Sequence, residues 1–292
     1  MTSLTLNSHA KLNLVLDVLG KRPDGFHELR TIFERVDLYD RITLSNRPDG
    51  KIKVICAHPQ VPKNKKNLVV KAALMLKKEL GISDGVTITI NKKIPVAAGL
   101  AGGSSNAATV LMGLNRLWQL NLSQKQLVEY AARVGSDVAF FIYNTSFALG
   151  EGRGERITAL PIRSKLWHVL VTPRFKMLTK EVFAKLSARR IGRKIPLTKN
   201  KDNVSILLPF LRENLSSNLG QGLSNDLEPA IFLLRPDFVK IKEKLRRAGA
   251  CGVCFSGSGP SVFALAESKK HAGQIKARFD KRFASVFVVS TF

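Results

Sequence analysis

The stretch from Pro95 to Ala108 has the residue types that most directly suggest chemistry. It is a run of small residues that contains three glycines and ends with Ser104 and Ser105 followed by Asn-Ala-Ala. Glycines let a backbone approach a ligand closely, and a helix N-terminus presents unpaired N–H groups at its positive dipole end. The alternating residues 86–90 predict a strand before this run, and apolar residues at helical spacing predict a helix from near Ser104. The combination predicts a cradle for phosphate groups, to which both serines add hydroxyls for phosphate oxygens or a magnesium ion.

A glycine-rich turn that only joins a strand to a helix is the alternative interpretation. The run from Ala101 to Ala108 is almost entirely small, which a plain turn does not require. It is not a Walker A loop, because no Lys-Ser or Lys-Thr follows the glycines. Its glycine spacing does not fit a dinucleotide fingerprint, and the HRD and DFG triplets of protein kinases are absent from the sequence. The sequence therefore predicts a phosphate site of another type.

Length and composition predict the broad organisation. The chain has 292 residues and is 45% hydrophobic, so two domains are expected, at residues 1–160 and 161–292. No run of about 18 apolar residues occurs, and the first residues alternate like a strand, so neither a membrane span nor a signal peptide is expected. Only 3 cysteines are present, which favours a reducing compartment and predicts a cytoplasmic protein.

The formal net charge of +25 predicts anionic partners. Nucleic acid is one such partner, but the 47 basic residues are spread over the whole length. The densest cluster, Lys185–Lys201, has no interleaved aromatic residue and is typical of a solvated insertion. A small polyanionic substrate fits the charge equally well. Because the basic residues are dispersed and their densest cluster lacks aromatic residues, nucleic acid is not the expected partner.

The segment from Cys251 to Cys254 has the Cys-X-X-Cys spacing of half a zinc site. No second Cys or His pair occurs at ligand spacing, and Val253 and Phe255 are typical of a buried strand. The spacing alone therefore does not predict zinc.

The two halves of the chain predict different arrangements of elements. Near the N-terminus, residues 4–18 alternate as a long strand, on which Lys11 and Asn13 share one face because side chains two apart point the same way. Asn67 is placed to cap a helix. From about Pro161 the predicted order is βαββαβ, the split ferredoxin-like arrangement, with helical insertions between about residues 178 and 234.

Six segments in order along the chain resemble motifs of the GHMP kinase superfamily. The segments are Ser8–Leu14, Arg22–Leu29, Pro95–Ala108, Gly135–Phe141, Asn225–Pro229 and Phe255–Ser261. The resemblance covers essentially the whole chain. It implies an α+β fold, the GHMP kinase fold, in which a ribosomal S5 domain 2-like N-terminal domain adjoins a ferredoxin-like (βαββαβ) C-terminal domain with the active site between them.

Three of these segments narrow the resemblance to one activity within the superfamily. It implies ATP-dependent phosphorylation of the 2-hydroxyl of a methylerythritol linked to cytidine diphosphate, a step of the non-mevalonate route to isoprenoids. ATP and Mg²⁺ are the implied cofactors, with Ser104 or Ser105 as a candidate magnesium ligand. The residues implied to bind ATP are Asn67, Pro95, Val96, Ala97, Ala98, Gly99, Leu100, Ala101, Gly102, Gly103, Ser104 and Ser105.

The resemblance also implies two catalytic residues. Lys11 would touch the transferring phosphoryl group and the acceptor hydroxyl, and Asp137 would take the proton from that hydroxyl. Without the resemblance, the sequence predicts that Lys11 is a strand lysine whose side chain reaches solvent. Asp137 then reads as the N-cap of a helix, because it follows Gly-Ser and precedes an apolar run.

Four residues are implied to bind the alcohol substrate: Asn13, Phe26, His27 and Phe183. An aromatic ring and an imidazole would stack on a cytosine and hydrogen-bond to it. The family usually has tyrosine where Phe26 stands, so the ring is kept and the hydroxyl is lost. The alternatives are a Phe26 in the core, a His27 that only solvates a turn and a Phe183 on the apolar face of a helix.

Two other functions stay open on the sequence. One is another small-molecule kinase of the same superfamily, such as a homoserine or mevalonate kinase, which would share the glycine loop without needing Phe26 and His27. The other is a basic nucleic-acid-binding protein with an S5-like fold, which would not need Asp137. Whether the protein is a monomer or a homodimer is also open.

Overall fold

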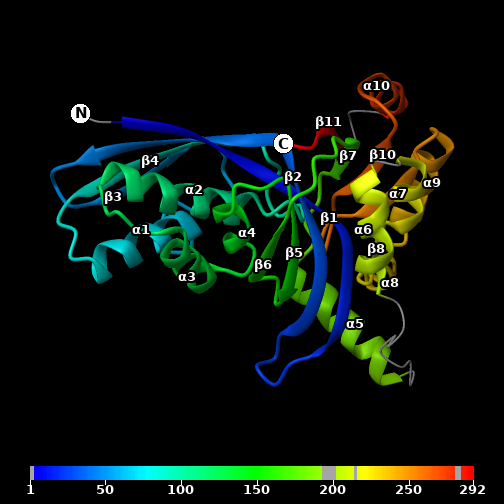
Figure 1. Cartoon of the computed structure of the whole chain (residues 1–292), viewed down its shortest axis with the longest axis horizontal. Helices are drawn as coiled ribbons and strands as arrows, with labels where there is room; N and C mark the ends of the chain where they lie inside the picture. The colour runs from blue at the N-terminus through cyan, green and yellow to red at the C-terminus, as the bar shows by residue number, and fades with distance from the viewer. Residues whose placement is uncertain (1–2, 193–201, 214–215, 280–283) are drawn as a thin grey trace.

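A computed structural model describes residues 3–192, 202–213, 216–279 and 284–292, and Figure 1 shows their arrangement. The N-terminal half is built on a hairpin of two long strands, β1 (Ser3–Lys21) and β2 (His27–Arg47). The other strands of this sheet are β3 (Ile52–Cys56), β4 (Gly85–Asn91), β5 (Phe147–Gly152), β6 (Arg156–Leu160) and β8 (Ser224–Asn225). The strand order is β3-β4-β2-β1-β8, with β5 paired to β2 and β6 paired to β5.

The C-terminal half has a second sheet of four strands in the order β11-β7-β10-β9. Its elements are β7 (Trp167–Pro173), α9 (Phe238–Arg247), β9 (Gly252–Phe255), β10 (Val262–Ala266), α10 (Lys269–Ala277) and β11 (Ala284–Ser290). Neighbouring strands are antiparallel throughout. The predicted βαββαβ order of this half is confirmed.

The insertion between β7 and α9 contains more than the helices that the sequence predicts. Its helices are α5 (Thr179–Gly192), α6 (Asn203–Glu213), α7 (Ser216–Gly222) and α8 (Glu228–Leu234). Between α7 and α8, however, the short strand β8 pairs in parallel with β1, so Val15 lies opposite Ser224. A strand of two residues has no alternating pattern for a sequence to reveal. The basic cluster Lys185–Lys201 lies largely outside the described residues.

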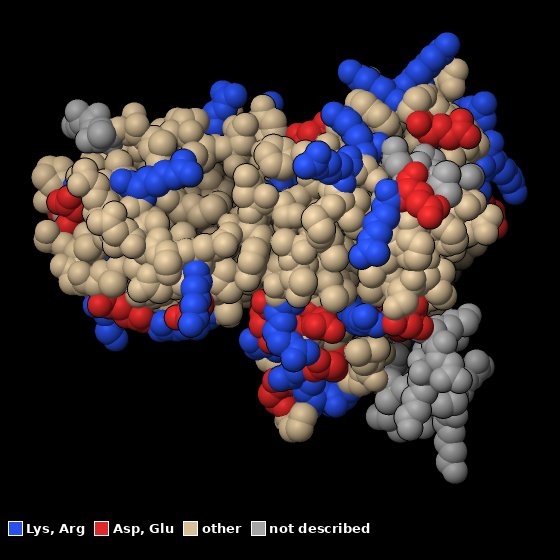
Figure 2. Space-filling model, in the orientation of Figure 1, with Lys and Arg blue, Asp and Glu red and all other residues tan. Residues whose placement is uncertain are grey.

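Positive charge is distributed over the face shown in Figure 2 rather than gathered in one patch. Around the tip of the β1–β2 hairpin, lysine and arginine alternate with carboxylates. There Arg22 pairs with Asp24 at 3.1 Å, and Glu28 accepts from both Arg22 and Arg156. This agrees with the dispersed charge of the sequence. Among the described helices, none has both the length and the apolar character that a membrane span requires.

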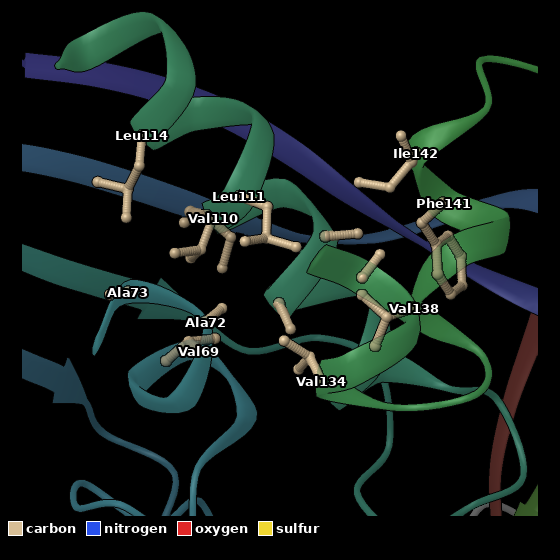
Figure 3. Packing of buried hydrophobic residues seen from close by; sticks show 14 of the residues in the cluster. Val69, Ala72, Ala73, Val110, Leu111, Leu114, Val134, Val138, Phe141 and Ile142 are labelled. Atoms are coloured by element: carbon tan, nitrogen blue, oxygen red, sulfur yellow. The ribbon is translucent and has the colours of Figure 1, made fainter. Parts of the chain in front are cut away.

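Helices α1 (Leu68–Glu79), α2 (Gly102–Leu117), α3 (Gln124–Val134) and α4 (Val138–Ile142) pack together against the N-terminal sheet. Figure 3 shows their contact, in which Leu111 and Leu114 of α2 face Ala72 and Ala73 of α1. All four of these side chains are fully buried. This packing fixes the position of α2, and therefore the direction in which its N-terminus points.

A second apolar cluster joins the two halves. It contains Leu12 and Leu14 of β1, Leu207 and Leu211 of α6, and Phe263 of β10. The halves therefore share a core. The predicted division at residues 160 and 161 stays a prediction.

Candidate active site

One cleft of about 1170 Å³ brings together nearly all the residues that the sequence predicts for the site. It is lined by β1, the β1–β2 turn, the loop before α2, the residues before α4, helix α5 and the turn after β9. Every predicted site residue lines this cleft except Ser105. Segments from both ends of the chain form the cleft, as the prediction of an interdomain site requires.

The loop before α2 has a backbone shaped for ligand approach. Ala97, Gly99 and Ala101 have φ angles of 54°, 75° and 52°. This left-handed region is strained for alanine, and such strain is concentrated at functional sites. Ala101 immediately precedes α2 and provides no side-chain cap. Ala101 therefore leaves the first N–H groups of α2 without a side-chain cap at the cleft, and such groups suit an anion.

Gly99 and Gly103 have different surroundings. A Cβ on Gly103 would meet no atom within 4 Å, so this position is open toward the cleft. A Cβ on Gly99 would lie 2.1 Å from the carbonyl oxygen of Ser256. Gly99 therefore permits contact with a second part of the protein, whereas the sequence interpretation gave it only a ligand-facing role.

The turn after β9 supports the glycine loop from behind. The Ser256 hydroxyl donates to the carbonyl oxygen of Gly99 at 2.9 Å, and the Ser261 N–H donates to that of Ala98 at 3.3 Å. Gly257 and Ser258 themselves line the cleft. The sequence identified Phe255–Ser261 only as a segment that resembles a family motif, and its contact with the glycine loop is seen in the structure.

Asn225 holds the turn after β9 in place. Its side-chain amide donates to the carbonyl oxygens of Phe255 at 3.0 Å and Gly257 at 2.8 Å, and its side-chain oxygen accepts from the Leu227 N–H. The neighbouring Asp226 accepts from the Val18 N–H at 2.9 Å. The Asn225–Pro229 segment therefore links β1 to the turn that supports the glycine loop.

The two serines of the glycine loop have different environments. Ser104 lines the cleft and is half-buried. Ser105 is 1% exposed, and its hydroxyl lies 2.7 Å from that of Ser8 on β1. Of the two candidates for phosphate or magnesium, only Ser104 is placed to contact a ligand, because helical rotation turns the next residue into the core.

Lys11 and Asn13 lie side by side on β1, as the alternation predicts. Lys11 is 4% exposed, so it does not reach solvent. Its Nζ donates to the Asn13 side-chain oxygen, and the Asn13 amide donates to Thr31 Oγ1 at 2.8 Å. The Lys11 backbone N–H donates to the carbonyl oxygen of Leu100 at 3.2 Å, which attaches β1 directly to the glycine loop.

Asp137 lies beside this lysine. One carboxylate oxygen is 3.7 Å from Lys11 Nζ, and the side chain is 33% exposed toward the cleft. It makes no capping hydrogen bond to α4, so the capping interpretation does not explain it. Burial lowers the pKa of the Lys11 ammonium from its ordinary value, and the Asp137 carboxylate opposes that shift.

Aromatic side chains line another part of the cleft. Phe26 is 54% exposed, which excludes a core role, and the Arg153 guanidinium lies 5.0 Å from its ring centroid. The His27 and Phe183 rings are 4.8 Å apart with an interplanar angle of 32°. His27 Nε2 lies 3.1 Å from the Ser187 hydroxyl. Phe183 also packs against the C-terminal core, so its place on the apolar face of a helix is observed and its stacking on a substrate stays a prediction.

Asn67 lines the cleft, but its polar atoms have partners within the chain. Its side-chain oxygen accepts from the Val69 N–H at 3.1 Å, which caps α1. Its amide donates to the carbonyl oxygen of Pro62 at 2.7 Å. The capping role is therefore present, and a contact with adenine stays a prediction.

The cleft is strongly positive. Asp137 is the one carboxylate among the described residues that line it. The cations that line it are Lys11, Lys21, Lys66, Lys92, Arg153 and Lys180. Lys92 pairs with the buried Asp40 at 2.6 Å, and burial lowers its pKa. The sequence analysis identified only Lys11, because the others stand at a strand end, in loops or in a helix, where no local pattern separates them from surface cations.

Two family models match the chain, one in each half. Residues 67–145 match the family model of the GHMP kinases N terminal domain, and residues 207–285 match that of the GHMP kinases C terminal domain. Proteins named 4-diphosphocytidyl-2-C-methyl-D-erythritol kinase from Bacillus anthracis and Bacillus cereus (strain AH187) are each 39% identical to the chain over 270 residues. Each comparison covers 92% of this chain and 90% of the relative.

Solved structures give the same result. A crystal structure of 4-(cytidine 5'-diphospho)-2C-methyl-D-erythritol kinase superposes with a TM-score of 0.81 at 30% identity, over 98% of both chains. A mevalonate kinase from L. major superposes with a TM-score of 0.79 at 17% identity, over 99% of this chain and 96% of that one. The second likeness is in the fold alone.

Gly103→Val tests where the phosphates bind. Because the added side chain has open space, the protein should fold, and the valine should cover the first turn of α2. We expect ATP affinity, measured by titration calorimetry, to fall at least about tenfold, equivalent to about 1.4 kcal/mol. Gly273→Val is the matched control, since this helical glycine in α10 also has no atom within 4 Å of an added Cβ. Normal ATP affinity in a folded Gly103→Val protein would place the phosphates elsewhere.

Proposed function

The chain belongs to the 4-diphosphocytidyl-2-C-methyl-D-erythritol kinases of the GHMP kinase superfamily, and from this membership we propose how its cleft performs the reaction. The reaction transfers the γ-phosphoryl group of ATP to the 2-hydroxyl of 4-diphosphocytidyl-2-C-methyl-D-erythritol, in the non-mevalonate route to isoprenoids. One observation carries the proposal: the Lys11–Asp137 pair, the glycine loop and the Phe26–His27–Phe183 group line a single cleft.

The ATP phosphates bind at the glycine loop. The uncapped N-terminus of α2 provides N–H groups there, and the cations of the cleft offset the negative charge of the phosphates. Phosphoryl transfer depends mostly on positioning and charge stabilisation, so a rigid and positive loop supplies what the reaction needs.

Asp137 accepts the proton of the acceptor hydroxyl. It is the one carboxylate among the described lining residues, and it is partly exposed to the cleft. A carboxylate in this position fulfils the role of the kinase base, since removing the proton makes the oxygen a better nucleophile as the phosphorus–oxygen bond forms.

Lys11 holds positive charge next to the reacting groups. Its ammonium lies 3.7 Å from Asp137, and its hydrogen bond to Asn13 fixes the direction of the side chain. Buried charge acts strongly because little water screens it. We therefore assign Lys11 to the transferring phosphoryl group and Asn13 to holding Lys11, with its amide fixed in turn by Thr31.

The cleft also fits a magnesium ion bound to ATP. Mg²⁺ prefers oxygen ligands and usually binds through substrate phosphates with one or two protein groups. The Ser104 hydroxyl and the Asp137 carboxylate are oxygen donors that line the cleft. When bound, the ion neutralises phosphate charge that builds up during transfer.

The aromatic group recognises the cytosine. The exposed Phe26 ring offers a stacking face, and His27 with Phe183 forms a second aromatic surface. Lys180 and Arg153 line the same cleft and suit the diphosphate.

Two further expectations rest on the sequence alone and stay predictions. They are that the protein is a monomer or a homodimer, and that it is located in the cytoplasm.

An assay of ADP release with several alcohols tests the function. We expect turnover with 4-diphosphocytidyl-2-C-methyl-D-erythritol and none above background with homoserine or mevalonate, because only the first carries a base for the aromatic group. Phosphorylation of homoserine or mevalonate with comparable kcat/KM would refute the assignment of the substrate.

Asp137→Asn tests the base. The amide keeps the shape of the side chain but accepts protons poorly, so we expect kcat to fall by roughly 10²–10⁴. ATP affinity should stay close to that of the wild type. Glu129→Gln, which removes one negative charge from an exposed site on α3, is the control and should keep full turnover. A near-normal kcat in Asp137→Asn would exclude Asp137 from proton transfer.

Phe26→Ala tests recognition of the cytosine. Stacking on an aromatic side chain contributes about 1–3 kcal/mol per base, so the KM for the alcohol should rise by roughly ten- to a hundredfold. The KM for ATP should barely change. Phe26→Tyr should match or improve on the wild type, since it keeps the ring. Equal weakening of both substrates in Phe26→Ala would contradict a specific contact with the base.

A further inference from the structure

Three metal-binding residue types meet at one end of the C-terminal sheet. Cys251 immediately precedes β9, Glu267 follows β10, and His271 lies in the first turn of α10. One ligand atom from each side chain lies within 4.8 Å of the other two. It is the one such group of three that the described part of the chain brings together. Figure 1 shows α10 at the edge of the molecule away from the tip of the β1–β2 hairpin.

Backbone hydrogen bonds hold Cys251 and His271 in place. The Cys251 N–H donates to the carbonyl oxygen of Leu265 at 2.9 Å, which fixes Cys251 beside the end of β10. Ser268 caps α10 by accepting from the His271 N–H at 3.1 Å. The His271 Nδ1 lies 3.9 Å from a Glu267 carboxylate oxygen. Cys251 and His271 therefore come from anchored positions on different elements, and the Glu267 carboxylate lies beside His271.

The structure also explains why the Cys-X-X-Cys spacing did not predict a metal site. Cys254 is buried in the core cluster that contains Phe263 and Leu265, and it is not part of the group that Cys251 forms with Glu267 and His271. Cys251 and His271 are half-buried, and Glu267 is exposed. The partners of Cys251 come from the next strand and helix, where the sequence search for a second pair found none.

We propose that Cys251, Glu267 and His271 bind a zinc ion, with a water as the fourth ligand. Zinc takes thiolate, imidazole and carboxylate ligands in tetrahedral geometry at about 2.0–2.3 Å. Two ligands at such distances lie about 3.5 Å apart, so the side chains have to close by about 1 Å. Magnesium and calcium prefer all-oxygen sites, and one sulfur with one nitrogen therefore selects zinc.

Binding the ion changes the protonation of the thiol. Burial and the Glu267 carboxylate raise the pKa of Cys251, so without metal the site holds a neutral thiol. Zinc binds the thiolate and releases that proton. The ion would then join the start of β9, the end of β10 and α10, and an ion that binds only the folded state raises its stability.

The zinc site is independent of the kinase cleft. None of its three residues lines the cleft. The proposal therefore does not rest on the proposed function, and turnover with Mg²⁺ and ATP should be the same with and without zinc.

The test is metal titration of the full-length protein after treatment with a chelator. We expect equilibrium dialysis to give one zinc ion per chain in the presence of excess Mg²⁺. Cobalt in place of zinc should give the near-ultraviolet charge-transfer band of a thiolate ligand. Zinc should also raise the melting temperature. Cys251→Ser should abolish the cobalt band, and His271→Ala should weaken zinc binding at least about tenfold, because loss of an outer partner alone costs about 10–100-fold.

Two controls separate the site from adventitious binding. His58→Ala removes a histidine outside the group and should bind zinc like the wild type. Glu267→Gln replaces an exposed carboxylate with a neutral amide, so the fold should be kept while zinc affinity falls and the thiolate band stays. Zinc binding that is absent from the wild type, or that is unchanged in both Cys251→Ser and His271→Ala, would overturn the proposal.

Discussion

The active site depends on keeping one ammonium group out of water. Lys11 is nearly completely buried, and an unpaired buried charge costs several kcal/mol. The surroundings offset that cost with the Asn13 side-chain oxygen, the Asp137 carboxylate and the face of the Phe33 ring at 5.0 Å from Nζ. These partners come from β1, β2 and the residues before α4. The elements that surround Lys11 must therefore be assembled before the ammonium can be held there.

The glycine loop is rigid for a related reason. Its left-handed alanines are strained, and such a backbone persists only where the surroundings fix it. The Lys11 backbone N–H fixes the loop from β1, and Ser256 and Ser261 fix it from the C-terminal half. Asn225 and Asp226 then tie that half back to β1. The phosphate loop is thus held between two parts of the chain that lie far apart in sequence.

The sequence predicted the parts of the site that are local patterns. Alternation placed Lys11 and Asn13 on one face, and small residues marked the glycine loop, whereas Phe26 was identified through the family resemblance. It could not distinguish Ser104 from Ser105, because the difference is one helical step and depends on where α2 begins. It also did not predict β8, or the reason for Gly99, because both are set by contacts with residues more than a hundred positions away.

Charge has different roles inside and outside the cleft. At the hairpin tip, arginines pair with nearby carboxylates, and such exposed pairs contribute little to stability. Inside the cleft, cations greatly outnumber the single carboxylate of the described lining residues. Two polyanionic substrates must occupy this space together, and their mutual repulsion would oppose close approach without these cations. The overall charge of +25 attracts anions from a distance. Positioning needs a more specific arrangement than this general attraction. Among the described residues that line the cleft, a carboxylate lies beside a buried ammonium group at Asp137 and Lys11, the pair to which we assign the proton transfer.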